Sequence, residues 1–212
     1  MRTSRVRTAT PLALLAVAAT CLLGCPDPQK AFDEFAEREV ANRKPPVEVA
    51  CGTATDTVEG KFVFALATQI SSKLPVLFIA DLTTEDDGLH MTVTALAAAD
   101  RKTLVGDPTD LGPFAIDPEN GKFTAALPEL TVDGKANPLT KDKDIVATIT
   151  LTGAVCEDAL CGDVRGQVTA PIDLKLEEGS TFYMDRLPDD GTIPEPPVVN
   201  CAGDVANPVP EP

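Results

Sequence analysis

Histidine is the side chain of this sequence best suited to acid–base chemistry, and the 212 residues contain only one, His90. Any Ser-His-Asp or Cys-His mechanism would therefore have to use His90. It lies on the polar side of an alternating segment whose apolar side is formed by Leu89, Met91 and Val93. We therefore expect His90 to be a solvent-facing strand residue, and we predict no catalytic residues. A single histidine also excludes metal sites built from two or three histidines.

Cysteine is the second reactive residue type, and four cysteines follow residue 50: Cys51, Cys156, Cys161 and Cys201. Four cysteines allow three pairings. Cys156 and Cys161 are five positions apart between two strand-like runs, so we predict a Cys156–Cys161 disulfide that clamps a hairpin loop. Cys51 and Cys201 then remain, and a bridge between them would tie the two ends of the domain together. The alternative is a four-cysteine zinc site, but the usual Cys-x-x-Cys spacing does not occur.

Acidic residues gather in short turn-like segments that could hold calcium, which takes carboxylate and carbonyl oxygens. The candidates are Asp86 and Asp87 in one turn and Asp117 and Glu119 in another, although neither turn matches the EF-hand pattern. Most acidic turns of an acidic protein are solvated corners, so calcium is possible and no other cofactor is expected. Paired carboxylates could also serve a hydrolase. The absence of tryptophan and the single tyrosine, Tyr183, provide few aromatic platforms for a sugar substrate.

The N-terminus has the organisation of an export signal. Three arginines, at positions 2, 5 and 7, precede an apolar run from Pro11 to Leu23. This run has 13 residues, whereas a helix that crosses a bilayer needs roughly 20. The run ends in Leu22-Leu23-Gly24-Cys25.

The Leu-Leu-Gly-Cys motif resembles the lipobox of bacterial lipoproteins. The resemblance implies that residues 1–24 are a signal peptide and that Cys25 is the lipid attachment site, with palmitate-type acyl chains as the membrane anchor. Pro26 stands where an aspartate favours retention in the inner membrane, so the resemblance implies anchoring to the cell outer membrane. It leaves open whether the protein faces the periplasm or the cell surface.

The charge of the chain limits its partners. The formal net charge is −15, and removal of the leader takes away three arginines and no acids, so the mature chain is more acidic still. Such a charge argues against nucleic acid and against contact with an anionic membrane surface. The expected partner is the membrane, through the N-terminal lipid, and a protein partner or small ligand stays open.

The rest of the chain divides into three parts. Residues 25–50 comprise the acylated N-terminus, a short stem helix over 27–43 and a proline linker. Residues 51–187 form a β domain, and residues 188–212 form an extended tail rich in proline and acids. Within the β domain, strands are predicted near 61–66, 76–80, 89–95, 114–116, 122–124, 145–155, 164–176 and 181–184.

About eight strands with short turns, and no helical pattern between them, predict an all-β fold, either an antiparallel sandwich or a small barrel. We expect a non-enzymatic structural or binding module. The alternatives are a carboxylate-dependent hydrolase and a carrier of an apolar ligand. A carrier requires a cavity of several hundred Å³. The phenylalanines that could line it are otherwise core residues: Phe62, Phe64, Phe78, Phe114 and Phe123.

Overall fold

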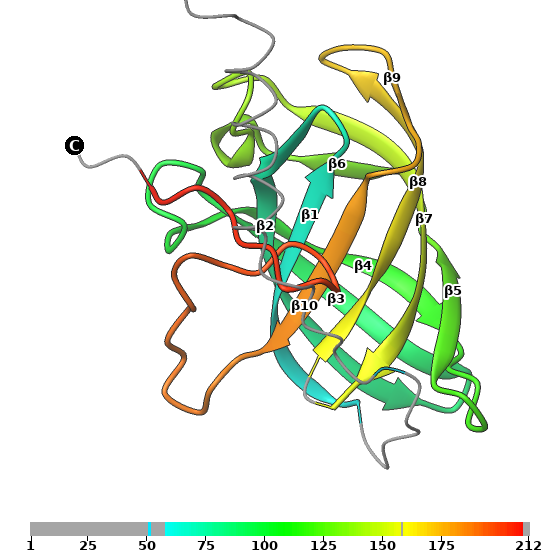
Figure 1. The fold of residues 1–212 in the computed structure, drawn as a ribbon. Helices are drawn as coiled ribbons and strands as arrows, with labels where there is room; N and C mark the ends of the chain where they lie inside the picture. Colours follow the sequence, from blue (N-terminus) through cyan, green and yellow to red (C-terminus); the bar gives the residue numbers. More distant parts are fainter. Residues whose placement is uncertain (1–50, 52–57, 158, 210–212) are drawn as a thin grey trace, which may run out of the picture. The chain divides into compact units, whose positions relative to one another are not determined.

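The computed structural model describes Cys51, residues 58–157 and residues 159–209 (Figure 1). Within these residues the regular elements are β-strands and one short 3-10 turn, so the predicted all-β class is confirmed. No helix in this part of the chain is long and apolar enough to cross a membrane. The predicted stem helix, the signal peptide and Cys25 lie outside the described residues. The elements are β1 (Gly60–Thr68), β2 (Ser71–Glu85), β3 (Gly88–Leu96), β4 (Leu104–Phe114), β5 (Lys122–Ala126), β6 (Leu130–Val132), η1 (Gly134–Ala136), β7 (Ile145–Cys156), β8 (Ala159–Ala170), β9 (Leu174–Leu176) and β10 (Thr181–Arg186).

The strands form one antiparallel sheet that curls into a half-barrel. Their order is β4-β3-β2-β1-β10-β8-β7-β5, with β6 pairing with β7 and β9 pairing with β8. The two edges approach each other at one point, where Ile116 bridges to Phe123 and the rings of Phe114 and Phe123 lie 5.3 Å apart. Of the two predicted architectures, the curled sheet is therefore closer to the barrel than to the sandwich.

Alternation of apolar and polar residues located several strands correctly, because one face of the sheet is buried. In β3, the predicted inward residues are buried and His90 lies on the other face. Most of β4 was not predicted, since Gly106, Pro108 and Gly112 interrupt its pattern. As an edge strand that pairs with β3, β4 tolerates these residues. β2 begins at Ser71, five residues before the predicted strand at 76–80.

The concave face of the sheet holds the main core. Four phenylalanine rings cross it in sequence: Phe78 lies 5.4 Å from Phe64, Phe64 lies 6.2 Å from Phe182, and Phe182 lies 6.0 Å from Phe123. The phenylalanines predicted as core residues are all buried there. The rings of Phe182 and Phe123 can meet because two glycines separate them in the sheet. Phe182 pairs with Gly162, Gly162 with Gly153, and Gly153 with Phe123.

The convex face is covered in part by the segment after β10, residues 187–209, here called the C-terminal strap (orange to red in Figure 1). Val199 and Ala206 of the strap pack on Ala65, Ala67 and Leu77, which is why residues 62–67 of β1 are buried on both faces. The strap has an irregular backbone and is packed on the sheet.

Polar contacts also hold the strap in place. The Arg101 guanidinium lies 3.3 Å from the Glu195 carboxylate. The Thr181 hydroxyl donates to the Val199 carbonyl at 2.8 Å. The Lys73 ammonium donates to the Val205 carbonyl at 3.0 Å. These contacts join the strap to β2, β10 and the loop after β3, so it behaves as part of the domain.

Candidate functional site

An apolar pocket opens at the end of the half-barrel where β6 and β9 lie (top of Figure 1). Its cavity volume is about 90 Å³. The wall comes from the ends of β1, β2, β7 and β8, from β6 and β9, and from two loops. The lining residues are Leu66, Thr68, Ile70, Leu74, Val76, Phe78, Leu130, Val132, Asn137, Pro138, Leu139, Thr140, Ile145, Ala147, Ile149, Val168, Pro171, Ile172, Leu174 and Leu176.

The rim of this pocket gathers most of the exposed apolar side chains of the domain. Six large hydrophobic residues are exposed in the described part of the chain, and four of them line the pocket: Ile70, Leu74, Leu139 and Ile172. Single exposed apolar residues are ordinary, whereas a group at one opening is typical of a binding site. Among the residues that the structure describes, no charged one lines the pocket.

The amide of Asn137, one of the three polar residues of the wall, is occupied by hydrogen bonds within its own loop. The buried Asn137 amide donates to the Thr140 hydroxyl at 2.8 Å and to the Lys143 carbonyl at 2.9 Å. Its oxygen accepts from the backbone N–H groups of Leu139 and Thr140, both at 3.0 Å. Asn137 thus builds the loop that presents Leu139 at the rim, and its amide is not left to bind a polar ligand.

None of the four rim residues was predicted as a site residue. Ile70, Leu74 and Leu139 lie outside the predicted strands, Ile172 lies within the predicted strand 164–176, and only the fold brings the four to one opening. A signal was present in their surroundings: Leu139 follows Pro138, Ile172 follows Pro171, and Ile70 lies in the β1–β2 turn. A large apolar side chain in a turn is exposed to water unless another group covers it. Such side chains therefore indicate a contact surface.

The cavity of this pocket is smaller than an enclosing carrier needs. A carrier that encloses its ligand requires several hundred Å³, and about 90 Å³ is less than the about 150 Å³ of an apolar cavity that holds benzene. All five phenylalanines considered as cavity lining pack in the core, and of these only Phe78 also lines this pocket. The volume of this pocket is too small for a whole lipid.

His90 lies in a group of carboxylates on the convex face. Its Nε2 is 2.8 Å from the Asp87 carboxylate and 4.0 Å from that of Glu85, and its Nδ1 is 3.8 Å from Asp110. The hydrogen bond with Asp87 raises the pKa of His90 above its usual value, with further contributions from the three carboxylate charges. The same hydrogen bond lowers the pKa of Asp87. His90 is thus an ion-paired surface residue, consistent with its prediction as a strand residue.

We expect Asp87→Asn to lower the pKa of His90, because it removes the hydrogen bond that favours the imidazolium. As His90 is the only histidine, its ring proton signal in an NMR titration reports that pKa directly. A raised pKa means that the pair stabilises the fold below about pH 6.5, and that this stability is lost as the pH rises through the folded-state pKa. The neighbouring Asp86→Asn is the control, since Asp86 is not among the groups that shift His90. Equal effects of the two variants would contradict the assignment.

The predicted calcium residues are not brought into one site. Asp87 belongs to a cluster with Glu85 and His90, and among the described residues no such cluster includes Asp86, Asp117 or Glu119. The Asp117 carboxylate accepts from the Glu119 backbone N–H at 2.8 Å and from the Asn120 amide at 2.7 Å. These bonds build the turn before β5, so Asp117 has a structural role.

The cysteines pair differently from the prediction. The disulfides are Cys51–Cys156 and Cys161–Cys201, so the predicted Cys156–Cys161 and Cys51–Cys201 pairs are wrong. Sequence proximity favoured a bridge within the hairpin, but the fold carries both terminal segments to its tip. Cys51 forms a bridge with the end of β7, and the strap brings Cys201 to β8.

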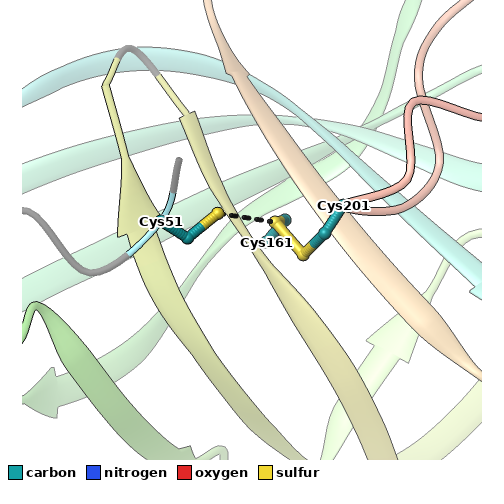
Figure 2. Close-up of side chains that lie close together, drawn as sticks. All are labelled: Cys51, Cys161 and Cys201. Atoms are coloured by element: carbon teal, nitrogen blue, oxygen red, sulfur yellow. Dashed lines mark hydrogen bonds between the residues drawn. A yellow bond between two sulfur atoms is a disulfide. The ribbon is translucent and has the colours of Figure 1, made fainter. Parts of the chain in front are cut away.

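All four sulfur atoms form one cluster on the convex face, as the close-up of three of them shows (Figure 2). The Sγ of Cys161 lies 3.5 Å from the Sγ of Cys156 and 3.9 Å from the Sγ of Cys51. The sulfur atoms of Cys51, Cys161 and Cys201 lie within 4.8 Å of one another. In this state each sulfur belongs to a disulfide and is not the thiolate that a zinc site requires.

Comparisons of the chain with protein-family models, with curated proteins and with solved structures find no match. The apolar pocket and the sulfur cluster are therefore the features from which a function can be inferred.

Proposed function

We propose that this protein is a lipid-anchored, non-enzymatic binding module of the outer membrane whose apolar pocket takes the end of an aliphatic chain. The observation that carries the binding role is the convergence of four exposed aliphatic residues at one opening without a charged group. The anchor rests on the Leu22-Leu23-Gly24-Cys25 motif and its leader. An acyl mass on Cys25 in membrane-extracted protein is the expected result for the anchor.

The wall favours an aliphatic ligand over a polar one. Apart from Thr68, Asn137 and Thr140, every lining residue is apolar, and Phe78 is the one aromatic residue among them. The Asn137 amide makes its hydrogen bonds within its own loop. Because the pocket offers no charge and little hydrogen bonding, its affinity comes from apolar area removed from water. Chain length, and not the head group, should then set the affinity.

The exposure of the rim also explains why a ligand would bind. In the absence of one, the side chains of Ile70 and Ile172 are about half exposed to water, at 54% and 47%. Inserting a methylene chain between these side chains covers both surfaces at once. Each buried methylene contributes about 0.8 kcal/mol, so a few methylenes give measurable binding.

The test is a titration of the mature chain, produced from Pro26 onward without acyl groups, with lauric acid as the probe. Binding is read from chemical shifts of the rim residues. Ile70→Lys is expected to weaken binding by about tenfold, equivalent to about 1.4 kcal/mol, because an ammonium group then occupies the apolar opening. The matched control is Leu104→Lys, which changes an equally exposed residue (57% against 54%) outside the pocket. Absence of laurate binding, or equal loss in both variants, would rule out the pocket as the site.

A further inference from the structure

We propose that the four cysteines form a two-electron redox site in which an external dithiol opens the Cys161–Cys201 disulfide and an internal exchange then releases Cys51. The product has a Cys156–Cys161 disulfide and free thiols at Cys51 and Cys201. The inference rests on the packing of two disulfides against each other, and it is independent of the apolar pocket.

The two disulfides are close enough that rotation of the Cys161 side chain, once its own disulfide is open, brings its thiolate in line with the Cys51–Cys156 bond without movement of the sheet. Thiol–disulfide exchange needs a thiolate in contact with a disulfide sulfur. The Sγ of Cys161 is already 3.5 Å from that of Cys156. The two residues are diagonal neighbours on one face of the β7–β8 pair, since Cys156 is opposite Ala159 and Ala154 is opposite Cys161. The hairpin itself therefore holds both sulfur atoms in place.

Exposure limits the start of the reaction to the two outer cysteines. Cys156 and Cys161 are each only 1% exposed, whereas Cys51 is exposed and Cys201 is partly exposed. Attack at Cys51 would expel the Cys156 thiolate, which exchanges with Cys161 and releases Cys201, so entry at either outer cysteine gives the same product. A thiolate of the dithiol attacks the Sγ of Cys201, which forms a mixed disulfide and expels the Cys161 thiolate. The second thiol of the reagent attacks its own sulfur in the mixed disulfide, expels the Cys201 thiolate and leaves the reagent as a cyclic disulfide.

The internal step follows from the thiolate left at Cys161. This thiolate attacks the Sγ of Cys156, the new Cys156–Cys161 bond forms, and the Cys51 thiolate leaves. The dithiol loses two electrons and two protons, and the protein gains two thiols while keeping one of its two disulfides. Exchange also moves the negative charge from buried Cys161 to exposed Cys51. Burial disfavours a thiolate and water stabilises it, so this direction is favourable.

The consequence is that one reduction frees both terminal segments from the hairpin. Cys51 ties the segment that leads to Cys25, and Cys201 ties the C-terminal strap. The hairpin tip gains a covalent clamp between its two strands in the product. A dithiol would therefore remove both covalent links between the terminal segments and the hairpin, while the hairpin itself acquires one disulfide.

Peptide mapping tests the proposal directly, because the tryptic sites separate the cysteines favourably. Cleavage at lysine and arginine gives peptide 44–61 with Cys51, peptide 144–165 with both Cys156 and Cys161, and peptide 187–212 with Cys201. In the oxidised protein the two disulfides link all three peptides. The folded mature protein is treated with one equivalent of dithiothreitol, trapped with N-ethylmaleimide and digested.

The expected product is peptide 144–165 alone and unlabelled, lighter than its dithiol form by two hydrogens, together with labelled peptides 44–61 and 187–212. Two other patterns overturn the proposal. One is a peptide 44–61 that stays linked to 144–165 with label on Cys161 and Cys201. The other is a mixture of fully oxidised and fully labelled protein.

Two variants keep the result interpretable. The variant Cys201→Ser leaves three of the four cysteines, so the exchange needs no added reductant. The maleimide label is expected mainly on Cys51. A label confined to Cys161 or Cys156 would contradict the exchange. The double variant Cys51→Ser, Cys156→Ser has only the Cys161–Cys201 disulfide. It should take label on Cys161 and Cys201 after the same treatment, which shows that the entry step occurs without the second disulfide. Failure to label would contradict entry at Cys201.

Discussion

Replacing Phe182 with alanine is expected to lower the free energy of unfolding by about 3–5 kcal/mol. Phe182 is fully buried at the centre of the concave face, with the ring of Phe64 on one side and that of Phe123 on the other. Truncation removes its apolar area and leaves a cavity between two parts of the curled sheet. The surrounding strands are hydrogen-bonded on both sides, so they cannot collapse to fill it.

The residues that neighbour Phe182 in the sheet explain why no other side chain can fill the cavity. A Cβ on Gly153 would lie 2.7 Å from the Phe182 ring, and one on Gly162 would lie 2.1 Å from the Thr152 carbonyl oxygen. The ring therefore occupies space that Gly153 leaves open, and Gly162 permits a close approach of the neighbouring backbone. Urea unfolding of the mature protein with its disulfides intact measures the loss, with Phe182→Leu as the control for a smaller reduction in volume. A loss below about 1 kcal/mol for Phe182→Ala would contradict this account.

Removing either disulfide is expected to produce the second large effect. In the chain-entropy model, a loop of the Cys161–Cys201 separation (40 residues) corresponds to about 4 kcal/mol, and one of the Cys51–Cys156 separation (105 residues) to about 5 kcal/mol. The double variants Cys161→Ala, Cys201→Ala and Cys51→Ala, Cys156→Ala each remove one bond and leave no unpaired cysteine among the four.

The comparison of the two variants also tests the pairing itself. Each should show one intact disulfide by mass and a clear fall in the urea midpoint. If the bonds were instead Cys156–Cys161 and Cys51–Cys201, both variants would leave one cysteine from each pair. The remaining two thiols would then react with maleimide in the freshly purified protein. Such labelling would contradict the observed pairing.

The local alternation of apolar and polar residues predicted part of the sheet. In β3 and β7, apolar residues alternate with threonines, and both strands lie where the alternation places them. Alternation works there because side chains of one strand point to opposite faces. It failed for β4, whose glycines and prolines are read as turns but are tolerated in an edge strand.

The disulfides show the limit of sequence spacing. Cys156 and Cys161 were predicted to pair because they are near in sequence, and their sulfur atoms are indeed 3.5 Å apart. Sequence proximity correctly predicted that the two cysteines lie side by side, but it predicted the wrong disulfide partners. Which cysteines pair depends on the positions of Cys51 and Cys201. These positions are set by the contacts of the strap and by the bridge between Cys51 and β7, and not by the hairpin.

The all-β class, several strands and the one-sided burial of β3 could be predicted from the amino-acid pattern, since each follows from alternation within a few residues. The disulfide pairing, the burial of both faces of β1 beneath the strap and the apolar pocket depend instead on long-range contacts of the folded chain. Ile70, Leu139 and Ile172 are far apart in sequence, and each is an unremarkable turn residue alone. They become one opening because the sheet curls and brings its loops together, and no local pattern records that long-range geometry.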